Sequence, residues 1–256
     1  MSPTIQQGIT QTFYGRVKKH AAPRGIDVAV SREHLQELFD AQGGRCVYTG
    51  IELVSLGNSN WNFSLDRIDS DLPYEEGNLQ FVYKPINSMK WTVPDDVFLL
   101  AVKSIVENEP VPVNMPEYIH GVSRRSTFKG VGPITGEFFN KVRRNAARRD
   151  IPFDLDIDYV YGLFVEQMGL CAYTSWPIKF PDLSMKRGGD ASIDRIDSSL
   201  GYIEGNIIIV HKNINYMKGS MTEDEFFQIV TEIYNWSIIL GQPNKIINKE
   251  GVLFFV

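Results

Sequence analysis

Residues 192–206 read SIDRIDSSLGYIEGN, and residues 64–78 read the closely similar SLDRIDSDLPYEEGN. Each stretch begins with a short segment in which apolar and polar residues alternate, continues through a polar loop and ends in Gly-Asn. Alternation with a period of two is typical of a half-buried β-strand, and clusters of Gly, Ser and Asp are typical of loops. The chain therefore encodes one strand-and-loop unit twice.

The repetition extends over most of the chain. A shift of 125 residues places Cys46 on Cys171, and after a three-residue length difference a shift of 128 places Asp66 on Asp194. Two copies are too few for a solenoid, so a tandem duplication of one domain is the simplest interpretation.

The repeat predicts the domain boundaries. We expect a first domain at 1–106, a linker at 107–130 and a second domain at 131–256. The linker begins with the proline-rich segment ENEPVPVNMPEY, and residues 241–256 form a C-terminal extension without a counterpart in the first copy.

Both copies show the same expected order of elements, which gives the fold class α+β. Helices are expected at 13–24 and 138–149, at 31–44 and 156–169, at 84–90 and 212–218, and at 94–106 and 222–234. Ser31 and Asp156 are suitable N-caps, and Thr222 with Glu225 forms a capping box. A strand and turn are expected at 46–53 and 171–180, and a second hairpin strand at 79–83 and 207–211.

Composition limits the class of protein. Of the 256 residues, 43% are hydrophobic and 22% charged, as in a soluble globular protein, and the net charge of −5 argues weakly against a nucleic-acid binder. The two cysteines cannot form a four-cysteine zinc site or a disulfide framework, which indicates a reduced cytosolic protein. Neither a membrane-spanning apolar run nor a signal peptide is indicated, so we expect a cytoplasmic protein that does not bind membranes.

The repeated polar residues form a recognisable constellation. It consists of Asp66-Arg67-Ile68, Asn78, Asn87 and Lys90 in the first copy, and of Asp194-Arg195-Ile196, Asn206, Asn215 and Lys218 in the second. This pattern resembles the HNH endonucleases, whose ββα-metal fold carries Asp-His-Ile, then Asn, then His or Asn nine residues later. The second copy looks especially like small phage-encoded proteins of this type. The resemblance implies two tandem ββα-metal domains, each with preceding helices and a trailing helix.

The resemblance also implies a metal site in each copy. Mg²⁺ prefers oxygen ligands and usually keeps several waters, so one carboxylate and one amide oxygen would leave room for phosphate oxygens. The expected ligands of Mg²⁺ or Mn²⁺ are Asp66 with Asn87, and Asp194 with Asn215. Asn78, Asn206, Lys90 and Lys218 take the family's supporting positions. A structural zinc, which this family variant often holds with four cysteines, is not expected with one cysteine per copy.

The departure from the family lies at the general base. The family's His after the Asp is replaced by Arg67 and Arg195, and a guanidinium cannot accept a proton from water. Three alternatives follow. The arginines could clamp the scissile phosphate while another group or hydroxide activates water, His211 could act as base in the second copy, or both sites could have lost catalysis.

Two helices carry basic residues that could contact phosphates. These are Arg16, Lys18, Lys19 and Arg24 in the first copy, and Lys141, Arg143, Arg144, Arg148 and Arg149 in the second. With two sites in one chain, the expected partner is double-stranded or branched DNA. A monomer would suffice because the repeat supplies a pseudo-dimer, and a phage-encoded protein would act in the bacterial host cytoplasm.

The leading hypothesis is a metal-dependent DNA endonuclease that hydrolyses phosphodiester bonds at two active sites. The alternative is a catalytically degenerate protein of HNH fold that binds nucleic acid or another partner. A third hypothesis is a partner-binding protein whose acidic surface avoids DNA.

Overall fold

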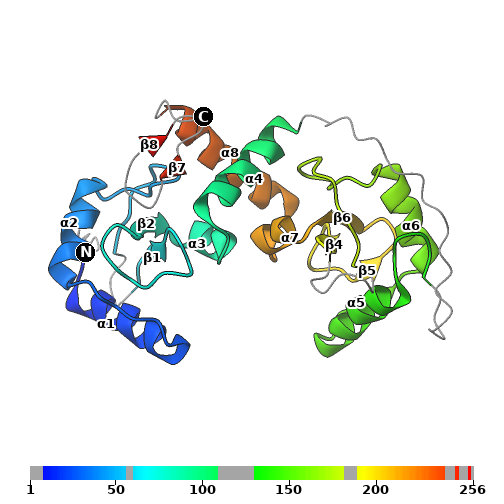
Figure 1. Cartoon of the computed structure of the whole chain (residues 1–256), viewed down its shortest axis with the longest axis horizontal. Helices are drawn as coiled ribbons and strands as arrows, with labels where there is room; N and C mark the ends of the chain where they lie inside the picture. Colours follow the sequence, from blue (N-terminus) through cyan, green and yellow to red (C-terminus); the bar gives the residue numbers. More distant parts are fainter. Residues whose placement is uncertain are drawn as a thin grey trace, which may run out of the picture. The chain divides into compact units, whose positions relative to one another are not determined.

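The computed structural model describes residues 8–55, 60–108, 130–181 and 189–239, and the backbone of two short strands near the C-terminus. The chain belongs to the α+β class and divides into two compact units (Figure 1). Unit 1 comprises residues 1–102 and 229–256, and unit 2 comprises residues 103–228.

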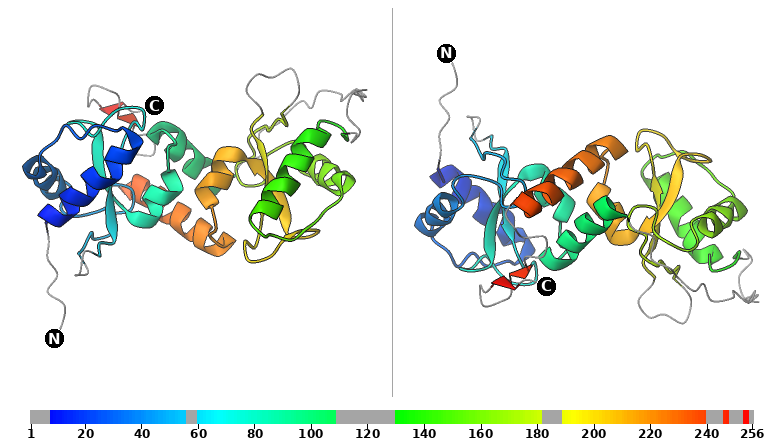
Figure 2. Two further views of the ribbon diagram at one scale, coloured as in Figure 1. Left: turned by 90° about the horizontal axis from the view of Figure 1, so that it is seen from below. Right: turned by 90° about the horizontal axis from the view of Figure 1, so that it is seen from above.

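Both units follow the same order of elements. Unit 1 contains α1 (Gln11–Ala21), a 3₁₀ turn (Ala22–Arg24), α2 (Arg32–Ala41), β1 (Phe63–Arg67), β2 (Leu79–Tyr83), α3 (Lys84–Lys90) and the start of α4 (Asp95–Glu107). Unit 2 contains α5 (Gly136–Arg148), β3 (Phe153–Asp154), α6 (Ile157–Glu166), β4 (Ala191–Arg195), β5 (Tyr202–Ile203), β6 (Ile207–His211), α7 (Lys212–Lys218) and the start of α8 (Glu223–Ile239). In each unit the long strand pair lies between the first two helices and the short helix that follows it (Figure 2).

Helix starts agree with the capping residues in the sequence. The side chain of Ser31 accepts a hydrogen bond from the backbone N–H of His34, and that of Asp156 accepts one from Asp158. Thr222 and Glu225 exchange the two hydrogen bonds of a capping box, at 3.0 and 3.2 Å. The capping predictions at these helices are therefore confirmed.

The two hairpins explain which residues face the core. β1 pairs antiparallel with β2 so that Asp66 lies opposite Gln80, and β4 pairs with β6 so that Asp194 lies opposite Ile208. Because side chains alternate across a strand, Phe63 faces an aromatic core and Ser64 faces α3. The rings of Phe13, Phe39, Phe63 and Phe81 lie 5.1–6.0 Å apart in this core.

Of the strand and turn expected at 46–53 and at 171–180, the turn is present and the strand was wrong. Both segments form tight turns with a single isolated bridge, Arg45 to Glu52 and Leu170 to Pro177. Gly50 adopts φ +66°, and its N–H donates to the Cys46 carbonyl at 2.8 Å, so the chain reverses too soon for a strand ladder.

The compact units do not cover the same residue ranges as the two sequence repeats, because each of α4 and α8 begins in one unit and ends in the other. Ser104 of α4 belongs to unit 2, where its Oγ accepts a hydrogen bond from Trp176 Nε1 at 3.0 Å. Trp236 of α8 belongs to unit 1, where its ring lies so close to Gly50 that a Cβ atom there would overlap with it.

Most of the expected linker and of the C-terminal extension lies outside the described residues. Within the extension the backbone forms β7 (Ile246–Ile247) and β8 (Leu253–Phe254), which pair antiparallel. Over the part of the chain that the structure describes, no helix combines the length and apolar character needed to cross a bilayer.

Candidate functional site

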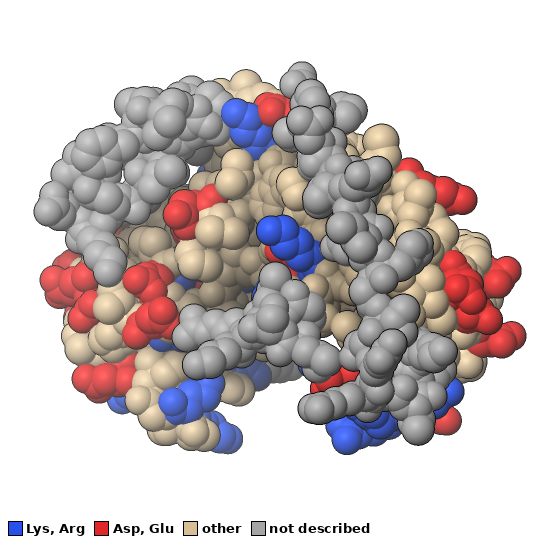
Figure 3. All heavy atoms as spheres, turned by 45° about the vertical axis from the view of Figure 1, so that its right-hand side comes forward, with Lys and Arg blue, Asp and Glu red and all other residues tan. Residues whose placement is uncertain are grey.

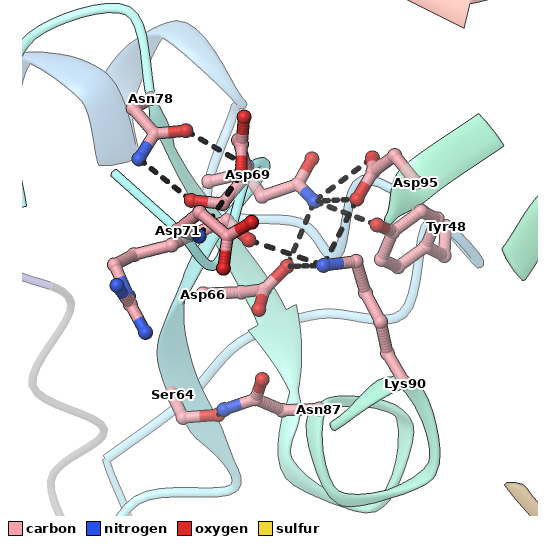
Figure 4. A network of polar contacts seen from close by, with 11 residues as sticks. Tyr48, Ser64, Asp66, Asp69, Asp71, Asn78, Asn87, Lys90 and Asp95 are labelled. Atoms are coloured by element: carbon pink, nitrogen blue, oxygen red, sulfur yellow. Dashed lines mark hydrogen bonds and ion pairs between the residues drawn. The ribbon is translucent and has the colours of Figure 1, made fainter. Parts of the chain in front are cut away.

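The centre of the first site is the buried carboxylate of Asp66 on β1, which is 4% exposed. The ammonium of Lys90, at the end of α3, has no exposed surface and lies 3.2 Å from Asp66 Oδ2. It also donates to the carbonyl of Arg67 at 3.1 Å, so the helix end is tied to the strand (Figure 4). Lys90 therefore holds one oxygen of the carboxylate and leaves the other free of this ion pair.

A polar network surrounds this ion pair in unit 1. The amide of Gln80 donates to Asp66 Oδ2 at 3.0 Å and to the hydroxyl of Tyr48 at 2.6 Å, and Asp95 Oδ1 lies 3.1 Å from Lys90 Nζ (Figure 4). Burial raises the pKa of Asp66, and the Lys90 ammonium and the Gln80 amide offset this only in part. Burial and then the neighbouring carboxylates also raise the pKa of Tyr48, which stays protonated.

Unit 2 repeats the ion pair with fewer neighbours. Lys218 Nζ lies 3.1 Å from Asp194 Oδ2 and donates to the carbonyl of Arg195 at 2.8 Å. Ile208 replaces Gln80, and the hydroxyl of Tyr173 donates to Glu223 at 2.7 Å. Among the described residues, the buried Oδ2 of Asp194 takes no hydrogen bond in good geometry despite the nearby ammonium. Burial raises the pKa of Asp194 as it does in the first unit.

The two asparagines on the short helices contact the strands that carry these carboxylates. The amide nitrogen of Asn87 donates to Ser64 Oγ at 2.8 Å, and that of Asn215 donates to Ser192 Oγ at 2.7 Å. In Figure 4 the amide oxygen of Asn87 points to the side on which Asp66 lies. Asn87 and Lys90 are three residues apart on one helix and so share a face, which brings both to the strand carrying Asp66.

Asn78 and Asn206 stand at the ends of the polar loops and fix their shape. Asn78 accepts from the Asp69 N–H at 2.8 Å and donates to the carbonyls of Asp69 and Pro73 at 3.1 and 2.9 Å. Asn206 makes the corresponding three bonds within its own loop. Gly77, directly before Asn78, adopts φ +80°, a conformation that favours glycine and turns the chain back towards β2.

Arg67 and Arg195, which directly follow the two aspartates, lie against the loop. Arg67 donates to the carbonyl of Leu72 at 2.5 Å, and its guanidinium lies 5.3 Å from the centre of the Tyr74 ring. Arg195 donates to the carbonyls of Ser198 and Leu200 and lies 5.4 Å from the Tyr202 ring. Because neighbours on a strand face opposite sides, these guanidinium groups turn away from the face that carries the aspartates.

His211 lies at the start of α7, where its side chain caps the helix. Its Nδ1 accepts a hydrogen bond from the Asn213 N–H at 3.2 Å, and its ring packs edge-on against Trp176. Burial lowers the pKa of His211, which keeps the imidazole neutral near pH 7. In the strand register His211 lies opposite Ala191, three positions from the Asp194–Ile208 pair.

The basic residues divide into two groups. Arg24 and Arg149 donate to the hydroxyls of Tyr74 and Tyr202 at 3.2 and 3.1 Å, so they hold the polar loops. The others occupy exposed positions on the two helices, namely Arg16, Lys18, Lys19, Lys141, Arg143, Arg144 and Arg148. Figure 3 shows that Lys and Arg side chains form local groups on a surface that also carries many Asp and Glu side chains. Lys18 and Arg16 also lie over the rings of Tyr14 and Trp61.

The donor set of each site suits a hard cation bound with few protein ligands. No group of three or more His, Cys, Asp and Glu side chains suited to a metal occurs among the described residues. An Asp–Asn pair offers two oxygen ligands, and Mg²⁺ sites that act on phosphates typically use one or two carboxylates plus phosphate oxygens and water.

Sequence reasoning missed several residues of this site. Ser64 and Ser192 accept hydrogen bonds from the asparagines. Tyr48 accepts one from Gln80, and Tyr173 donates one to Glu223. Asp95, at the start of the next helix, forms an ion pair with Lys90. The signal was present in each case, because these residues occupy equivalent positions in the two copies.

Comparison with known proteins adds one relative. A stretch of 84 residues is 31% identical to a protein of Enterobacteria phage T4 described as an uncharacterized 29.0 kDa protein in the dda-modA intergenic region. The alignment covers 33% of this chain and 32% of the phage protein, so the chain spans about a third of that relative. No family model matches the chain, and no solved structure matches it. The chain is thus similar to a phage protein over one stretch of its length.

Proposed function

We propose that this chain is a metal-dependent DNA endonuclease of the HNH type, built from two tandem ββα-metal domains with one active site each. One observation carries the proposal. In both units a buried aspartate on a hairpin strand lies beside an asparagine of the following short helix, and the amide nitrogen of that asparagine is already hydrogen-bonded. The oxygens that remain are those that a divalent cation takes as ligands.

Asp66 with Asn87, and Asp194 with Asn215, would hold Mg²⁺ or Mn²⁺. A bound ion of this kind stabilises negative charge on the phosphodiester and on its leaving oxygen. Lys90 and Lys218 favour the ionised form of the aspartates, which is the form that binds a cation. Their ion pairs also tie the carboxylates of the strands to the short helices that carry the asparagines. The distance between the two expected ligands is thereby held constant.

The loop residues support the site from the opposite face of the strand. Arg67 and Arg195 remain protonated and therefore cannot take a proton from water. Their bonds to loop carbonyls and their contacts with Tyr74 and Tyr202 hold the loop that follows the ligand strand. Water would then be activated by another group or by hydroxide.

The exposed basic residues of α1 and α5 would bind the phosphates of double-stranded or branched DNA. Contacts of this kind release counterions, so affinity should fall steeply as salt rises. The overall charge of −5 argues only weakly against this, because attraction to DNA depends on the local arrangement of charge.

Cleavage of supercoiled plasmid with Mg²⁺ or Mn²⁺ tests the proposal. The wild type should give nicked and linear products, and Asp66→Asn and Asp194→Asn should each give mainly nicked product. The double variant should be inactive, and Asp71→Asn, an exposed loop position, is the matched control. Activity of the double variant equal to that of the wild type would reject the two sites.

A second candidate function is favoured by the arginines and by His211. Since the arginines hold the loop and His211 caps a helix, none of the three residues is placed to act as a base. A catalytically degenerate HNH-fold protein that binds nucleic acid would shift DNA in a gel at low salt and cleave none with any divalent metal.

A further inference from the structure

We propose that Ser64 and Ser192 are positioning residues that orient the amide groups of Asn87 and Asn215, so that the amide oxygens face the aspartates. This inference rests on the proposed function, because it assigns the amide oxygens as metal ligands. Each serine lies two residues before its aspartate, on the same face of the same strand.

The hydrogen bonds give the direction of each amide. A serine hydroxyl both donates and accepts, so the bond to serine alone is compatible with either end of the amide group. In unit 2 the amide nitrogen of Asn215 also lies 3.3 Å from the carbonyl oxygen of Ile193. A carbonyl oxygen only accepts, so the end of the amide that faces β4 must be the nitrogen. The oxygen of Asn215 therefore faces away from Ser192.

Unit 1 has the corresponding serine bond. Ser64 Oγ lies 2.8 Å from the nitrogen of Asn87, and the oxygen of Asn87 points to the side of Asp66 (Figure 4). Lys90 and Gln80 take the other carboxylate oxygen, Oδ2. The amide oxygen of Asn87 therefore faces the Asp66 carboxylate, the other expected ligand (Figure 4).

Removing the serine hydroxyl should weaken metal binding, because the amide nitrogen of the asparagine then loses this hydrogen-bond acceptor. With an apolar side chain in place of serine, the orientation that offers oxygen to the metal leaves one N–H of the partly buried amide without its serine acceptor, and in unit 2 only the longer contact of 3.3 Å to the Ile193 carbonyl remains. The competing orientation turns the nitrogen towards the metal position, where a cation cannot bind it. The site is then either strained or reversed.

The experiment compares isosteric side chains at position 192 in the full chain carrying Asp66→Asn, so that the second site alone is followed. Free Mn²⁺ is titrated by its electron paramagnetic resonance signal. Ser192→Thr, which keeps the hydroxyl, should bind within about twofold of the parent, and Ser192→Val should bind at least about tenfold more weakly. The mirror set uses Ser64→Thr and Ser64→Val in the Asp194→Asn chain.

A rescue separates orientation from a merely structural effect. Asn215→Asp replaces the amide by a carboxylate whose two oxygens are equivalent, so no orientation is needed. In that background Ser192→Thr and Ser192→Val should bind Mn²⁺ equally, within about twofold. A loss with valine in both backgrounds would mean that serine supports the fold and would overturn the inference.

The remaining outcomes are also distinct. Equal binding by the threonine and valine variants, with a parent that binds Mn²⁺, overturns the positioning role and leaves the proposed function standing. A parent chain that binds no Mn²⁺ at this site rejects the metal site itself, and with it both proposals.

Discussion

Lys90 and Lys218 are charged residues whose side chains are fully buried. Each ammonium group depends on one aspartate and one backbone carbonyl, with a second carboxylate for Lys90. A buried charge that loses its partner costs far more than the pair itself contributes. The lysines therefore couple the integrity of the fold to the candidate metal ligands.

Replacing Lys218 should be strongly destabilising. Lys218→Met leaves Asp194 buried without its counter-charge and should lower the free energy of unfolding by about 3–5 kcal/mol. The matched control is Lys212→Met on the exposed face of the same helix, which should change it by less than about 0.5 kcal/mol. Urea denaturation at pH 7 measures both, and equal effects of the two substitutions would contradict the ion-pair account.

His211 makes the stability of the chain depend on pH in a defined window. Burial lowers its pKa in the folded chain below the ordinary value of 6.5, so the unfolded chain binds the proton more readily. The contribution of His211 is therefore present above pH 6.5 and is lost as pH falls through the lower folded value.

The test uses the residue that the first copy carries at this position, Tyr83. His211→Tyr should remove this part of the acid loss, so its free energy of unfolding should decline less than that of the wild type between pH 7 and pH 5. Parallel pH profiles of the two proteins would show that His211 does not titrate differently on folding.

At the scale of elements, the short helix after each hairpin ends at a residue with positive φ. The residue after the lysine has φ 49° and ψ −110° at Trp91, and φ 58° and ψ −119° at Gly219. Glycine adopts this conformation readily, whereas a residue with a Cβ atom is strained there by about 1–3 kcal/mol. The first copy therefore holds a strained tryptophan where the second holds a relaxed glycine.

Trp91→Gly should raise the free energy of unfolding by about 1 kcal/mol, since strain relief exceeds the added entropy of the unfolded chain. Gly219→Trp is the reciprocal variant and should lower it by at least as much. Thermal and urea unfolding of the two variants measure the difference. A loss of stability in Trp91→Gly would show that contacts of the indole outweigh the backbone strain.

Much of each element could be predicted from the duplicated sequence. Capping residues marked the starts of α2, α6 and α8, and alternation marked the hairpin strands. A strand was expected beside the turn at 46–53 because Cys-Val-Tyr-Thr has high β-propensity, whereas Gly50 at positive φ reverses the chain before a strand forms.

The candidate site could be predicted only in outline. Spacing indicated which residues belong to one constellation, but the ion pair of Asp66 with Lys90 depends on how a seven-residue helix packs on the hairpin. Alternation along β1 already implied that Arg67 faces away from Asp66, and the family comparison obscured this. The serines required no family knowledge, since both copies carry them two residues before the aspartate.

At the scale of the whole molecule, each compact unit contains a helix end from the other repeat. Unit 1 includes Trp236 against Gly50, and unit 2 includes Ser104 bonded to Trp176 and Asn108 bonded to Ser175. The exchange is reciprocal, because Asn108 and Trp236 occupy equivalent positions in the repeat, as do Gly50 and Ser175. Neither repeat therefore contains all the residues of a unit.

Fragments cut within residues 109–129 should show this dependence. Residues 1–120 and 121–256 should each unfold at a temperature at least about 5 °C below the intact chain, because each lacks the helix end that completes its unit. Mixing the two fragments should restore much of the lost stability. Circular dichroism melts measure this, and fragments as stable as the intact chain when kept apart would contradict the exchange.

The number of Mn²⁺ ions bound per chain tests the central claim most directly. Titration followed by electron paramagnetic resonance should give two bound ions for the wild type, one for Asp66→Asn, one for Asp194→Asn and none for the double variant. The substitutions keep the shape of the side chain, and unfolding curves verify that each variant is folded. Two bound ions in the folded double variant, or none in the wild type, would contradict the assignment of the Asp–Asn pairs as metal sites.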